Sequence, residues 1–104
     1  MDIQQVRDNL ESLPEEIEVS EKEYLEARAQ LNYMKDLSKR VLAKLMAEHS
    51  GSVAEKERLA LSSVQYGIHL QGVKSQEVLV AEKASRFHKL ANLFEAMRSL
   101  NKNV

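Results

Sequence analysis

Residues 49–55, which read HSGSVAE, predict a reversal of the chain near its midpoint. Gly51 suits the left-handed backbone conformation that commonly follows the last turn of a helix. Ser52 and Glu55 have the spacing of a capping box, in which the serine hydroxyl accepts a hydrogen bond from the third helical N–H. One helix is therefore expected to end, and an antiparallel one to begin, around a turn at residues 49–52.

The composition favours helix on both sides of this turn. Of the 104 residues, 43% are hydrophobic and 30% are charged, whereas only 5% are aromatic, and the chain has three glycines and one proline. Strands and tight turns draw on aromatic, β-branched, glycine and proline residues, while Ala, Leu, Glu, Lys, Gln, Met and Arg favour helix. We therefore predict an all-α protein, and its length fits a single domain spanning residues 1–104.

Two apolar stripes with the spacing of a coiled coil flank the turn. The upstream stripe consists of Ile17, Ser20, Tyr24, Ala27, Leu31, Met34, Ser38, Val41 and Leu45. The downstream stripe consists of Leu59, Ser63, Tyr66, Leu70, Val73, Glu77, Val80, Ala84, Phe87, Ala91, Phe94 and Arg98. The stripes predict a long antiparallel helical hairpin, coiled-coil-like, with arms at about residues 14–49 and 53–101.

Proline and glycine modify both arms. Proline is tolerated in the first turn of a helix but not in its interior, so Pro14 predicts a helix start and a separate short helix at residues 2–12. Gly67 and Gly72 each weaken a helix by about 1 kcal/mol relative to alanine, so we expect a kink or a loosened turn there.

Charge is distributed unevenly along the chain. Residues 1–26 contain nine acidic and two basic residues, whereas residues 27–104 contain seven acidic and thirteen basic ones. Folding about the turn brings residues 15–26 opposite residues 77–88, so the acidic start is expected to lie against the basic end. Glu77 is expected to pair with a basic residue across the hairpin, Lys22 or Arg28. The alternative is a nucleic-acid footprint, made of Lys83, Arg86, Lys89, Arg98 and Lys102.

A second apolar stripe occupies the last third of the chain. It consists of Leu79, Leu90, Leu93, Met97 and Leu100. Phe87 and Phe94 lie on the hairpin stripe and are expected in the core. Because one helix face already serves the hairpin, the second stripe predicts a partner: another copy, forming a homodimer or higher homo-oligomer in a helical bundle, or another protein.

No catalytic or cofactor-binding pattern is present. The chain has no cysteine, and His49, His69 and His88 lack the spacing of a zinc site. The many carboxylates are dense and solvated, with no pair singled out as acid and base. We therefore predict a protein that is not an enzyme and binds neither metal nor cofactor. No apolar run reaches the ~18–20 residues of a membrane span, and no secretory signal is recognisable, so a cytoplasmic protein is predicted.

Residues 94–100, which read FEAMRSL and follow a basic helical segment, resemble the C-terminal ends of small helical proteins encoded in phage early regions. The resemblance covers about fifteen residues and implies a replication or recombination setting by gene neighbourhood only. It transfers no catalytic residues.

These observations predict a non-enzymatic protein–protein interaction or assembly module that self-associates through its helices. Two alternatives stay open: a nucleic-acid-binding accessory factor, and a small helical chaperone or adaptor that holds a partner helix between its arms.

Overall fold

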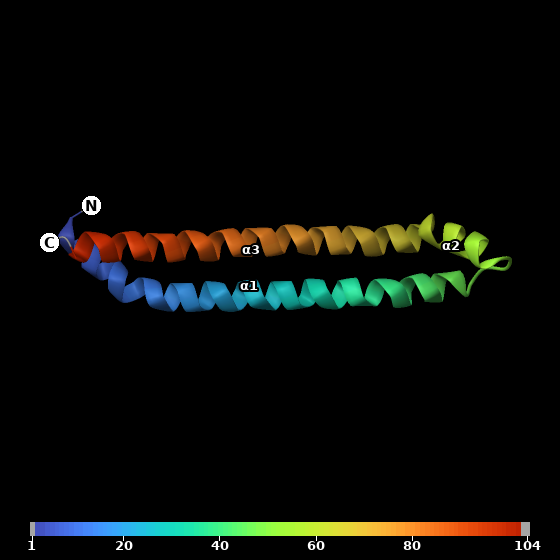
Figure 1. The fold of residues 1–104 in the computed structure, drawn as a ribbon, viewed down its shortest axis with the longest axis horizontal. Helices are drawn as coiled ribbons and strands as arrows, with labels where there is room; N and C mark the ends of the chain where they lie inside the picture. Colours follow the sequence, from blue (N-terminus) through green and yellow to red (C-terminus); the bar gives the residue numbers. More distant parts are fainter. Residues whose placement is uncertain (1, 103–104) are drawn as a thin grey trace. The chain divides into compact units, whose positions relative to one another are not determined.

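The computed structural model describes residues 2–102, and within them the protein is helical, with no strand. The helices are α1 (Ile3–Met46), α2 (Val53–Leu61) and α3 (Val64–Lys102), with α1 and α3 antiparallel (Figure 1). The prediction of an all-α protein is confirmed. None of the described helices is long and apolar enough to cross a membrane.

The chain divides into two compact units, each made from one segment of α1 and one of α3. Unit 1 combines the residues up to Ala27 with those from Val80 onward, and unit 2 comprises Arg28–Leu79, including α2. The prediction that residues 1–104 behave as a single domain stays a prediction.

The predicted turn lies between α1 and α2. Gly51 has φ 117°, a conformation that glycine adopts without the steric cost that a Cβ atom imposes. Ser52 caps α2, and its hydroxyl accepts a hydrogen bond from the Glu55 N–H at 3.2 Å. A Cβ atom at residue 51 would also collide with the Glu55 carboxylate. α1 ends at Met46, three residues earlier than expected, because residues 47–49 continue as a hydrogen-bonded turn.

Replacing Gly51 with alanine is expected to lower the free energy of unfolding by about 1–2 kcal/mol, since the new side chain meets a disfavoured φ, while the exposed Glu55 carboxylate can move away from it. Urea unfolding followed by far-ultraviolet circular dichroism measures the change. Ser50→Ala, at the exposed neighbouring position, is the control and is expected to change little.

The start of α1 differs from the prediction, because α1 runs without a break through Pro14. It begins at a reciprocal capping box, in which the Gln5 N–H donates to Asp2 Oδ1 at 2.8 Å and the Asp2 N–H donates to Gln5 Oε1 at 3.0 Å.

The first turns of α1 bend toward the C-terminal end of α3 (Figure 1). This bend carries Val6 and Leu13, which are 3% and 2% exposed, into the core of unit 1. The separate helices predicted at 2–12 and 14–49 are therefore wrong, since burial on both sides of the proline outweighs its helix-breaking tendency.

The downstream arm is also interrupted at a different place. The single helix predicted at 53–101 is divided at Ser62 and Ser63, and Gly67 lies inside α3. Ser62 Oγ donates a hydrogen bond to the Arg58 carbonyl at 2.9 Å. Ser63 Oγ donates to the Ala60 carbonyl at 2.7 Å and accepts from the Tyr66 N–H at 3.1 Å. Two adjacent serines that compete for backbone groups end one helix and cap the next.

The upstream apolar stripe is the inner face of α1 as predicted, since each of its residues is buried or half-buried. The downstream stripe is displaced in part. Leu70, Glu77 and Arg98 are exposed, and their places are taken by His69 and by two other neighbours, Gln76 and Met97. The other nine residues of the stripe are half-buried, so the predicted inner face of the arm is kept and the stripe is misplaced by one residue at these three positions only.

Candidate interaction surfaces

The second apolar stripe is not a single outward surface. Met97 is 4% exposed and packs with Val6 and Leu13, and Leu90 packs against the same cluster. Met97 therefore lies in the core and not on an outward face, whereas Leu90 is half-buried beside it, and contact of Leu90 with a partner stays a prediction. Leu79, Leu93 and Leu100 remain 37%, 38% and 49% exposed, and their contact with a partner stays a prediction.

Phe94 packs against this core cluster, as predicted. Phe87 faces Tyr24, with near-parallel rings (15°) and centroids 6.2 Å apart. His88 flanks both Tyr24 and Phe87, at 6.5 Å and 5.3 Å. The aromatic side chains of unit 1 thus serve the contact between α1 and α3.

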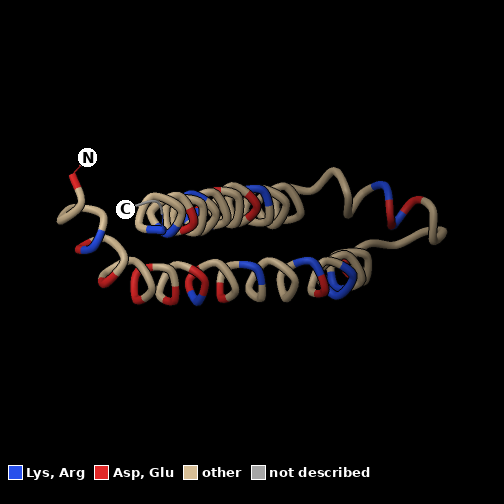
Figure 2. The backbone as a smooth tube through the Cα atoms, turned by 60° about the vertical axis from the view of Figure 1, so that its left-hand side comes forward, with Lys and Arg blue, Asp and Glu red and all other residues tan. Residues whose placement is uncertain are grey.

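The acidic start and the basic end meet in unit 1. Figure 2 shows Asp and Glu concentrated along the first half of α1. Lys83 Nζ lies 3.0 Å from Glu23 Oε2, across the two helices. Arg86 lines an open hollow of about 310 Å³ together with Ser12, Glu15, Glu16 and Val19, and its charge also acts on the Glu23 carboxylate. Arg98 pairs with Glu95 on its own helix at 3.1 Å. Lys89 and Lys102 are exposed.

Three of the five residues of the predicted nucleic-acid footprint therefore lie close to carboxylates. The attraction of such a surface for phosphates depends on net positive charge, which these carboxylates reduce. Nucleic-acid binding through the five residues stays a prediction.

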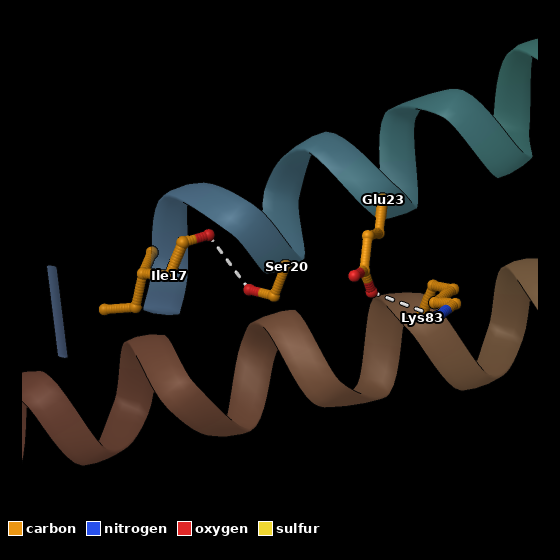
Figure 3. A network of polar contacts seen from close by, with 4 residues as sticks. All are labelled: Ile17, Ser20, Glu23 and Lys83. Carbon is orange, nitrogen blue, oxygen red and sulfur yellow. Dashed lines mark hydrogen bonds and ion pairs between the residues drawn. The ribbon is translucent and has the colours of Figure 1, made fainter. Parts of the chain in front are cut away.

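The contact between Glu23 and Lys83 adjoins a buried serine (Figure 3). Ser20 is 2% exposed, and its hydroxyl donates to the Ile17 carbonyl at 2.9 Å, so a polar atom at the helix contact is satisfied within α1. The hydrogen bond from Lys83 and its positive charge hold the pKa of Glu23 below the ordinary value of 4.5, with Arg86 adding to the effect and partial desolvation opposing it.

Glu23→Gln is expected to remove a pH-dependent part of the stability. Because the pKa of Glu23 is lower in the folded chain than in the unfolded one, the contribution is complete above 4.5 and is lost as the pH falls through the folded pKa. Wild type and variant should therefore differ near neutral pH and converge in acid, as measured by urea unfolding at several pH values. Lys83→Gln should give the same pattern, and the double variant should lose no more than either single one. Equal differences at all pH values would contradict the assignment.

Unit 2 has its own polar contacts between the helices. Lys35 Nζ lies 3.7 Å from Glu77 Oε1, with both side chains about half exposed. The expected partners of Glu77, Lys22 and Arg28, are therefore wrong, because the pair forms further along α1, at Lys35. Ser38 Oγ lies 2.7 Å from His69 Nε2, a contact that the sequence analysis did not anticipate.

A further surface in unit 2 was also missed. Residues 59–73 contain no Asp, Glu, Lys or Arg, in a chain of which 30% is charged. On α3, uncharged and exposed residues recur at steps of three and four, and we call them the uncharged face: Val64, Gly67, Ile68, Gln71, Ser75 and Val78. Val64 and Ile68 are 75% and 66% exposed, among the most exposed large apolar side chains described. The absence of charged residues from positions 59–73 is the feature of the sequence that could have predicted this surface.

Among residues 2–102, no three His, Asp or Glu side chains converge on a position for a metal ion. A second hollow, of about 260 Å³, lies along α1 in unit 2 and is lined by Tyr33, Asp36, Leu37 and Arg40. Both hollows are open depressions on the surface.

No family model, no curated protein and no solved structure matches this chain. The resemblance of residues 94–100 to phage early-region proteins, and the replication or recombination setting that it implies, stay predictions.

Proposed function

We propose that this protein is a non-enzymatic interaction module that self-associates through its helices. The observation that carries the proposal is its exposed area. The chain exposes 7581 Å², whereas a compact monomer of 11.9 kDa is expected to expose about 6,000 Å². The difference, about 1,600 Å², is roughly twice what each partner buries in a standard protein interface.

The small core supports the same proposal. Among the described residues, seven hydrophobic side chains are buried, and two of these are alanines. A protein of about 100 residues depends on apolar burial to offset the conformational entropy lost on folding. Association with a second copy adds such burial, and it makes the stability of the fold depend on protein concentration.

Sedimentation velocity over a dilution series tests the proposal. We expect a species of twice 11.9 kDa or more at micromolar concentration, and dissociation on dilution. The unfolding midpoint should rise with protein concentration over the same range. A single species of 11.9 kDa at every concentration would overturn the proposal.

A further inference from the structure

The uncharged face of α3 is unusual for a surface in contact with water. Its six residues carry no formal charge over about four helical turns, and exposed Lys74 borders them beside Gln71 and Val78, whereas the exposed faces of helices are normally charged or strongly polar. Val64 and Ile68, one turn apart, are more than half exposed. Contiguous exposed apolar residues at helical spacing are typical of an interaction site.

Gly67 lies in the middle of this face. A Cβ atom built there would meet nothing within 4 Å, so no contact within the chain requires a glycine. Glycine in a helix interior is nonetheless unfavourable. Its lack of a side chain permits close approach by a second backbone, and the described chain supplies none at this position.

We propose that the uncharged face of α3 is where a second copy of this chain packs, with Gly67 near the crossing point of the two helices. The proposal rests on the self-association proposed above and assigns it a surface. It differs from the C-terminal stripe expected from the sequence, of which Met97 is in the core of unit 1 and Leu90 packs against that core.

The charge pattern favours a second copy over a different partner. In a twofold-symmetric dimer the same patch lies on both sides of the interface, so a charged patch would face like charge. The six uncharged residues meet their copies without repulsion, with Lys74 at the edge of the contact, and Gln71 and Ser75 can act as both donor and acceptor toward their copies. The exposed area of the whole chain exceeds that of a compact monomer by about 1,600 Å². A standard interface buries about 800 Å² on each partner, so the chain has enough exposed surface to form one.

The test introduces one negative charge at a time and measures the dimer dissociation constant by sedimentation velocity. Val64→Glu is expected to weaken the dimer by about a hundredfold, because two copies of an unpaired carboxylate enter the interface. Val53→Glu is the matched control, since Val53 is also a valine in unit 2 and is 72% exposed against 75% for Val64. It is expected to leave the dissociation constant within about threefold of the wild type.

Gly67→Gln provides a second test that separates association from folding. Glutamine favours helix and meets no atom of the same chain, so the circular dichroism of the diluted protein should show helix content equal to or above that of the wild type. The dimer should nonetheless dissociate about tenfold more readily, because the new side chain occupies the crossing point. Tighter or unchanged association of this variant would overturn the proposal.

The outcomes distinguish this proposal from the one on which it rests. A wild-type chain that stays monomeric overturns self-association itself. A wild-type dimer that Val64→Glu leaves intact overturns only the assignment of the surface. Leu93→Glu, on the C-terminal stripe, adds the remaining comparison: if it dissociates the dimer and Val64→Glu does not, the interface lies on that stripe and the present assignment is wrong.

Discussion

Leu13→Ala is expected to lower the free energy of unfolding by about 3 kcal/mol, because the side chain is 2% exposed and its removal leaves a cavity between α1 and α3. The cluster around it contains only two other buried residues, Val6 and Met97. A typical small protein is stable by only about 5–15 kcal/mol, so this loss is a large part of the total. Urea unfolding at a fixed protein concentration measures the change.

Leu100→Ala is the control for this substitution. It removes the same atoms from the same unit, but Leu100 is 49% exposed and lies outside the cluster. Its effect is expected to stay below about 1 kcal/mol, because the lost burial is smaller and no closed cavity forms. Equal losses from the two variants would show that the bent start of α1 does not pack on α3 in solution.

Pro14→Ala is expected to raise the free energy of unfolding by about 1–3 kcal/mol. Proline in a helix interior costs about 3 kcal/mol relative to alanine, because it lacks the N–H that would bond to residue 10 and its ring crowds that carbonyl. Part of this gain is offset if the straighter helix packs Val6 less closely. Urea unfolding gives the free energy, and far-ultraviolet circular dichroism should show no loss of helix.

The control is Glu16→Ala, which places alanine at an exposed position two residues further along α1. It is expected to change stability by no more than about 0.5 kcal/mol. A Pro14→Ala variant less stable than the wild type would mean that the bend made by the proline, and the burial of Val6 that accompanies it, contributes more than the restored helical turn.

The interaction surfaces were less predictable than the fold. Spacing along α3 places Leu90, Leu93 and Met97 on one stripe, but spacing does not show which stripe another segment covers. The bend of α1 brings Val6 and Leu13 onto Leu90 and Met97 and leaves Leu93 38% exposed. The contact between Glu23 and Lys83 was foreseen as a meeting of acidic and basic segments, since charge composition alone predicts it, although not the individual pair.

The features that could be predicted from the sequence are those that depend on local interactions. Helix content, the glycine turn at Gly51 and the cap at Ser52 depend on residues within a few positions of one another, and each appears as the sequence indicated. The capping box at Asp2 and the serine break before α3 are equally local and were readable by the same rules.

Only the tertiary structure decided whether a helix passes through Pro14 and which residues of α3 face inward. Both depend on burial against a segment some eighty residues away in the chain, as for Leu13 and Met97. The free energy of that burial exceeds the helix preference of any single residue, so it overrides local preferences where the two disagree. The turn at Gly51, which is determined locally, reverses the chain so that segments distant in the sequence can pack together. Their packing then determines which residues are buried.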